Sequence, residues 1–221
     1  MNQFIIMKTL TYLLLLICLI SCDTHDQKTT NDEESSPPEM NNDWSAIASD
    51  EALVATALMA APEEFRGEST VIGYNMAGEF VTLREGSNDL ICLADDPKKE
   101  GFNAACYHKE MEPFMARGRA LRAEGMGAED VFNQREEEVK SGKLSMGKDG
   151  STLHIYYGPD SQYDPSTSEV QNAKYRYVVY MPFATAASTG LPESPIAPNH
   201  PWIMNPGTHR AHIMISPVNG E

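Results

Sequence analysis

The sequence predicts an α+β fold, in which a mostly antiparallel sheet has helices packed on one face. Two observations lead to this prediction. Segments with an apolar residue at every second position lie on both sides of a central region, and that central region repeats its apolar residues every three or four positions. Strands followed by helices and then by strands again are the order typical of α+β proteins.

The first elements of the fold are predicted to be a helix and three strands. Ser49 is a good N-cap for a helix, and Pro62 ends that helix because proline cannot continue it. The strands are predicted in the segments STVIGYN (69–75), GEFVTLR (78–84) and NDLICLA (88–94). Since turn residues separate these segments, we expect them to form an antiparallel meander.

The central region is predicted to form a helical hairpin. The apolar face of its first helix carries Met111, Phe114, Met115, Gly118 and Leu121. That of its second helix carries Ala128, Val131, Phe132 and Val139. Gly125 and Gly142 follow the two helices and suit their C-terminal ends. Three more strands are predicted in STLHIYY (151–157), AKYRYVVYM (173–181) and HRAHIMI (209–215), separated by long polar loops.

The composition limits the classes of partner. The chain has 221 residues, which allow one domain of ordinary size and a tail, and its formal net charge is −15. A surface this acidic repels nucleic acid and anionic lipid headgroups. Nucleic acid is therefore excluded as a partner, and attachment to a membrane would need a contribution other than charge.

The N-terminus has the parts of a secretory signal. Lys8 supplies the positive charge, and Leu10–Ile20 is an apolar run too short to span a bilayer. The run ends in Leu19-Ile20-Ser21-Cys22, which resembles the lipobox of bacterial lipoproteins. The resemblance implies that the signal is cut before Cys22 and that this cysteine carries lipid. The alternative is an ordinary signal peptide or signal anchor in which the cysteine occurs by chance.

Three regions follow from this reading of the chain. Residues 1–21 are predicted to be the signal peptide. Residues 22–43 are polar, acidic and almost free of apolar side chains, so they are predicted to be a disordered tether. Residues 44–218 are predicted to form a single globular domain. The resemblance implies a protein of the cell envelope that is anchored to a bacterial membrane by lipid and faces the periplasm or the surface.

Cys92 and Cys106 are the two cysteines that remain in the predicted domain. Outside the cytoplasm, two cysteines fourteen positions apart most simply form a disulfide. The alternatives are two buried thiols or a redox or metal role, although the sequence has no CxxC motif. The stretch from Ala105 to Met115 contains cysteine, histidine, glutamate and methionine side chains, but its periodicity predicts a helix entrance, with Met111 and Met115 in the core.

The candidate ligand or metal residues lie in the C-terminal strands. Alternation places His154 and Tyr156 opposite Leu153 and Ile155. If the aliphatic sides of these strands meet the helices, the other face of the sheet carries the polar side chains. Together with a residue just before the last strand, the candidates are His154, Tyr156, His209, Arg210, His212 and Met214. One interpretation is a solvated sheet face. The other is a ligand or metal site, in which imidazole and thioether groups hold copper or zinc, or Arg210 with Tyr156 holds an anion or a sugar.

The sequence lacks the named catalytic motifs, including GxSxG, HExxH and the Walker loop. It therefore favours a lipid-anchored lipoprotein with a non-enzymatic binding or accessory domain, which binds an unknown small molecule or envelope protein. Two alternatives remain open. One is a periplasmic protein that binds copper or zinc, and the other is an exported enzyme with a site assembled from scattered residues.

Overall fold

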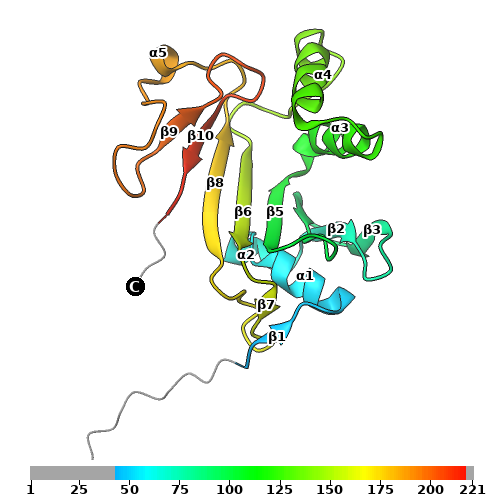
Figure 1. The fold of residues 1–221 in the computed structure, drawn as a ribbon. Helices are drawn as coiled ribbons and strands as arrows, with labels where there is room; N and C mark the ends of the chain where they lie inside the picture. Colours follow the sequence, from blue (N-terminus) through cyan, green and yellow to red (C-terminus); the bar gives the residue numbers. More distant parts are fainter. Residues whose placement is uncertain (1–42, 218–221) are drawn as a thin grey trace, which may run out of the picture. The chain divides into compact units, whose positions relative to one another are not determined.

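The computed structural model describes residues 43–217, which are built around an eight-stranded sheet with the strand order β3-β2-β4-β5-β6-β8-β10-β9 (Figure 1). The strands are β2 (Thr70–Tyr74), β3 (Phe80–Arg84), β4 (Leu90–Leu93), β5 (Phe102–His108), β6 (Thr152–Gly158), β8 (Lys174–Tyr180), β9 (Trp202–Met204) and β10 (His212–Ile215). A separate pair joins β1 (Ser45–Ala46) to β7 (Gln162–Tyr163). The predicted signal peptide, Cys22 and the predicted tether as far as residue 42 lie outside the described residues.

Helices complete the α+β fold that the sequence predicts. They are α1 (Asp50–Leu58), α2 (Glu63–Arg66), the 3-10 turn η1 (Lys109–Met111), α3 (Glu112–Ala123), α4 (Ala128–Lys140) and α5 (Ala186–Thr189). The predicted N-cap is confirmed, because the hydroxyl of Ser49 accepts a hydrogen bond of 3.1 Å from the amide of Ala52. Within residues 43–217 no helix combines the length and the apolar character needed to cross a bilayer.

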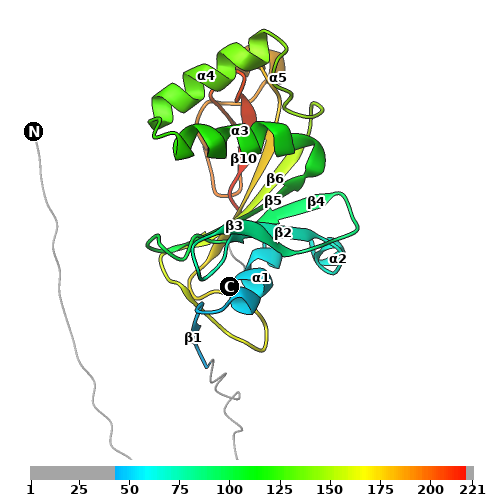
Figure 2. The ribbon, with the colours of Figure 1, turned by 90° about the vertical axis from the view of Figure 1, so that its right-hand side faces the viewer.

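The helices cover both faces of the sheet, not one. Leu53 and Ala57 of α1 pack in one core cluster with Cys106. Phe114 of α3 packs in a second cluster with Tyr107, which follows Cys106 on β5. Figure 2 shows α3 and α4 on one side of the sheet and α1 on the other. Because neighbouring residues of a strand point to opposite faces, the clusters around Cys106 and Tyr107 lie on opposite sides of the sheet.

The first three strands do not form the predicted meander. β3 pairs with β2 in antiparallel fashion, but β4 lies on the other side of β2 and runs parallel to it. After β3 the chain returns along the start of β2, where the amides of Ser87 and Asn88 both donate to the carbonyl of Glu68. This return places Ile91 of β4 beside Thr70, the first residue of β2, so the two strands run in the same direction.

A central strand lies where the sequence predicts a loop. Residues 102–108 form β5, between β4 and β6, and Cys106 therefore lies within the sheet instead of at a helix entrance. The predicted disulfide is confirmed, since Cys92 and Cys106 are direct neighbours in the β4–β5 register and their sulfur atoms are 2.01 Å apart. Alanine and asparagine are poor strand signals, which explains why the segment around Asn103 and Ala104 does not predict β5.

The helical hairpin is confirmed. Gly125 follows α3 with a φ of 88°, a left-handed conformation that glycine adopts without strain. Arg117 of α3 joins Glu138 of α4 through hydrogen bonds of 2.7 to 3.0 Å. The C-terminal strands are also found, but β10 begins at His212, and His209 and Arg210 belong to the turn before it. The edge strand β9 was not predicted.

Candidate ligand-binding site

The structure divides the predicted site residues between the two faces of the sheet. His154 lies opposite Tyr177 in the β6–β8 register, and Tyr177 lies opposite Ile215 in the β8–β10 register. His154 therefore shares a face with Ile215, whereas His212 and Met214 point to the face that α3 and α4 cover. The prediction placed the histidines of both strands on one face because it assumed that the isoleucines of β10 meet the helices. In the structure Met214 meets them instead.

The C-terminal histidines are buried in separate places. The ring of His209 lies 5.7 Å from the ring of Phe114 and 4.7 Å from that of Phe132, beneath the helical hairpin. His212 is also buried, and its Nδ1 lies 2.7 Å from the carbonyl oxygen of Arg210. Among residues 43–217 no three His, Cys, Asp or Glu side chains are placed to hold a metal ion. His154, His209 and His212 do not form one metal centre.

A cleft of about 350 Å³ opens on the face that carries His154 and Tyr156. We call it the tyrosine cleft. It lies where the end of α1 and the start of α2 meet β6 and β8, beyond the part of the sheet that α1 covers. Its lining consists of Ala60, Ala61, Pro62, Glu63, Arg66, His154, Tyr175 and Tyr177. Its volume falls in the range of about 300–1,000 Å³ that is typical of small-molecule sites.

A row of aromatic rings forms the wall of this cleft on the sheet side. Tyr175 stacks on Tyr156, with ring centres 4.6 Å apart and planes within 20°. Tyr177 continues the row, and the edge of its ring meets His154 at 5.5 Å. The row exists because Tyr175 and Tyr177 lie two residues apart on β8, and β6 places Tyr156 and His154 directly opposite them. Tyr156 is anchored beneath the row, since its hydroxyl accepts a hydrogen bond from the amide of Val170.

Arg66 forms the helical wall of the cleft. Its Nε donates to the carbonyl of Ala61 at 3.0 Å and its Nη2 to that of Met59 at 3.3 Å. These bonds satisfy carbonyl groups just after α1 and hold the guanidinium in place. Burial raises the pKa of Tyr175, and the neighbouring Arg66 guanidinium partly offsets this effect. The Tyr175 hydroxyl therefore stays protonated at neutral pH.

His154 lines the cleft together with the carboxylate of Glu63. Burial lowers the pKa of its imidazole, so the ring is neutral at pH 7. Its Nε2 lies 3.3 Å from the hydroxyl of Thr152. No carboxylate among residues 43–217 forms an ion pair with this imidazole. Catalytic hydroxyl–histidine pairs depend on such a group to orient the ring, so the arrangement suits hydrogen bonding to a ligand better than nucleophilic catalysis.

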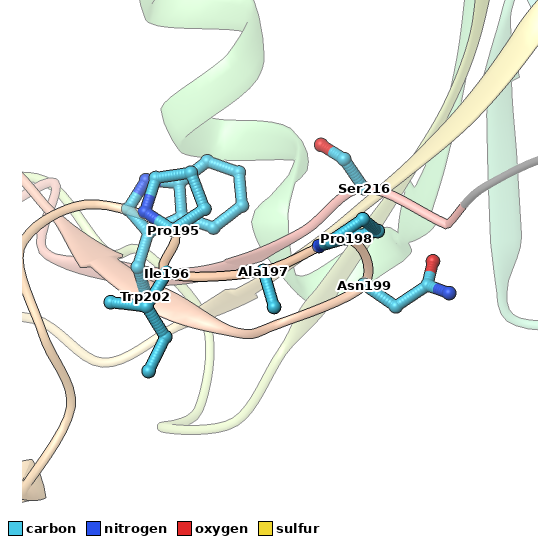
Figure 3. Close-up of a pocket in the computed structure, with 7 residues that line it drawn as sticks. All are labelled: Pro195, Ile196, Ala197, Pro198, Asn199, Trp202 and Ser216. Atoms are coloured by element: carbon cyan, nitrogen blue, oxygen red, sulfur yellow. The ribbon is translucent and has the colours of Figure 1, made fainter. Parts of the chain in front are cut away.

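A second hollow lies at the other end of the sheet, beside the edge strand β9 (Figure 3). It measures about 510 Å³ and is lined by Pro195, Ile196, Ala197, Pro198, Asn199, Trp202 and Ser216. Five of these residues are consecutive in one exposed loop, and none carries an acidic or basic group. The tyrosine cleft is therefore the better candidate, because it combines apolar walls with converging polar groups.

Sequence reasoning identified part of this cleft. His154 and Tyr156 were predicted, while Tyr175, Tyr177, Arg66 and Glu63 were not. The segment KYRYVVY does place two tyrosines on one face of a strand, and the alignment of β6 with β8 would have brought them beside His154. Comparison of the chain with protein-family models, curated proteins and solved structures finds no match. The function must therefore be argued from the geometry.

Proposed function

We propose that this protein is a lipid-anchored lipoprotein of the bacterial cell envelope, whose folded domain binds a small molecule without transforming it. Two features support the location. The segment Leu19–Cys22 resembles a lipobox, and the acidic stretch that follows it has the composition of a tether. The tyrosine cleft supports the binding role, since it joins apolar surface to a neutral imidazole, tyrosine hydroxyls and a fixed guanidinium.

The groups of the cleft indicate the class of ligand. Arg66 donates to oxygen acceptors, and the hydroxyls of Tyr175 and Tyr177 donate or accept hydrogen bonds. Ala60 and Ala61 offer apolar surface beside them. We infer a compact ligand with an aliphatic or aromatic body and an oxygen-bearing polar end, which lies against Arg66. Polar groups that fix the orientation of a mostly apolar ligand are typical of small-molecule sites.

The lipid anchor predicts the location of the protein. We expect Cys22→Ser protein to lose incorporation of an alkyne-labelled palmitate and to move from the membrane fraction to the soluble fraction. Serine has no thiol to form the thioether, and acyl chains supply the membrane affinity through their buried methylene groups. Gel fluorescence of labelled cells and fractionation measure both effects. Cys22→Ser protein that stays in the membrane with its label would show that the anchor lies elsewhere.

The cleft predicts a ligand whose retention depends on Tyr177. We expect native mass spectrometry of wild-type protein, incubated with a small-molecule extract of its own envelope, to show an added mass. Tyr177→Ala should lose this mass, because the substitution removes one wall of the cleft. Tyr157→Ala is the matched control, since Tyr157 lies on the opposite face of β6. The same added mass on wild-type and Tyr177→Ala protein would place the ligand outside the cleft.

A further inference from the structure

Positive side chains gather beneath the helical hairpin, on the opposite face of the sheet from the tyrosine cleft. Arg122 comes from α3, Arg135 from α4, and Arg210 and His209 from the turn before β10. We call these four residues the arginine cluster. None of its arginines forms an ion pair with a carboxylate among residues 43–217, although the chain as a whole is strongly acidic.

Arg135 is the centre of the cluster. Its side chain is only 5% exposed, and its guanidinium lies 4.0 Å from the centre of the Phe114 ring. Its Nη1 donates to the carbonyl of Phe114 at 3.2 Å. A Cβ at Gly118 would lie 2.7 Å from Nη1 of Arg135 and 3.7 Å from Nη1 of Arg122. The two guanidiniums therefore approach each other over a glycine that leaves room for them.

Several buried polar atoms of the cluster have no hydrogen-bond partner. His209 is 0% exposed, and both of its ring nitrogens lack a partner. The Nε atoms of Arg135 and Arg210 are also buried and unpartnered. A buried polar group that is left unpaired lowers the stability of the folded state, and an unpaired charged group lowers it more. Such a concentration of unsatisfied donors is unusual in a protein that lacks a role for them.

The acidic residues nearest to the cluster are already paired. Glu138 binds Arg117, with 2.7 Å between its Oε1 and Nη2 of Arg117. Glu136 pairs with Lys140 at 3.1 Å. Burial, and next the charge of Arg210, lower the pKa of Arg135 to about 10. Glu138 opposes this shift from a distance, but no carboxylate of the described chain pairs directly with an arginine of the cluster.

We propose that the arginine cluster is a binding site for a small oxyanion, a carboxylate or a phosphate group, held by the guanidiniums of Arg122, Arg135 and Arg210. Planar guanidiniums bind two oxygens of such groups at once, and an anion would supply the missing counter-charge. Arg122 is exposed and Arg210 half-buried, so they form the entrance, and Arg135 lies behind them. This site is separate from the proposed ligand cleft and does not depend on it.

Titration calorimetry of the mature protein with inorganic phosphate and with citrate, each at constant ionic strength, tests the proposal. We expect binding of one or both anions. Arg122→Gln and Arg210→Gln should each weaken it by about tenfold or more, because each removes a charge-assisted hydrogen bond. Arg176→Gln is the matched control, since Arg176 lies on the same face of the sheet but bonds to Tyr157. No binding of either anion, or equal binding by all variants, would overturn the proposal.

The pH dependence of binding gives a second readout. Burial, and next the charge of Arg135, lower the pKa of His209 to about 4, with Glu136 opposing the shift and Arg210 and Lys140 adding to it. A bound anion raises this pKa, so binding takes up a proton and strengthens as the pH falls. We expect sulfate, whose charge is constant between pH 7 and pH 5, to bind more tightly at pH 5. Weaker binding at pH 5 would contradict the placement of the anion beside His209.

Discussion

Replacement of Gly86 by alanine should destabilise the domain by about 3 kcal/mol or more. Overpacking of a well-packed site typically costs about 1–3 kcal/mol, and here the obstacle is rigid. A Cβ at this position would lie 2.3 Å from the carbonyl carbon of Ser69 and 2.3 Å from the amide nitrogen of Thr70. Both atoms belong to the backbone at the start of β2, so no side-chain rotation relieves the contact.

The position of Gly86 also explains the parallel pairing of β2 with β4. The chain reverses here so close to β2 that only glycine fits, and the next two residues bond to Glu68. Urea unfolding followed by circular dichroism measures the effect. Gly67→Ala is the matched control, because a Cβ there meets nothing within 4 Å and the residue has an ordinary φ. Equal stability of the two variants would show that β2 and Gly86 do not lie in contact.

Removal of the disulfide should lower the free energy of unfolding by about 3 kcal/mol, the value that the chain-entropy model gives for a loop of this length. The bond joins Cys92 to Cys106 across a separation of 14 residues, and both side chains are 0% exposed. It links neighbouring strands at the point where α1 packs on the sheet, with Cys106 in the same core cluster as Leu53. Its loss removes a constraint on the unfolded chain and leaves a less complete core.

Denaturant unfolding of the double substitution Cys92→Ala and Cys106→Ala measures this effect. A Cys22→Ser background removes the lipid and keeps the protein in solution. We expect the midpoint of unfolding to fall and to become insensitive to dithiothreitol, while the parent protein loses stability when the reductant is present. A parent protein whose stability does not respond to dithiothreitol under unfolding conditions would indicate free thiols in solution.

Local patterns predicted the elements whose residues contact their own neighbours in sequence. Ser49 caps α1 through a hydrogen bond to a residue three positions later, and Gly125 follows the last turn of α3. Both features can therefore be predicted from short segments of the sequence. Strands whose own segments carry a weak pattern were missed, and β5 is the main example. β5 is a strand because β4 and β6 flank it on both sides, and its segment FNAACYH has little alternation of its own.

The candidate site was only partly predictable for the same reason. Alternation correctly places His154 and Tyr156 on one face, but it does not say which face the helices cover. Met214 and Ile213 are both apolar, and only the packing decides that Met214 enters the core with Phe114. Arg66 reaches the cleft through bonds to carbonyls five and seven residues earlier, which depend on the turn between α1 and α2. The spacing of apolar residues in the sequence does not predict an arrangement of this kind.

The most direct test of the central claim is a crystal structure of the protein purified under native conditions from its own membrane. We expect electron density for a bound small molecule in the tyrosine cleft, in contact with Arg66 and Tyr177 and beside the ring of His154. A structure in which the small molecule is bound elsewhere on the fold, and the tyrosine cleft holds only ordered water, would contradict the claim.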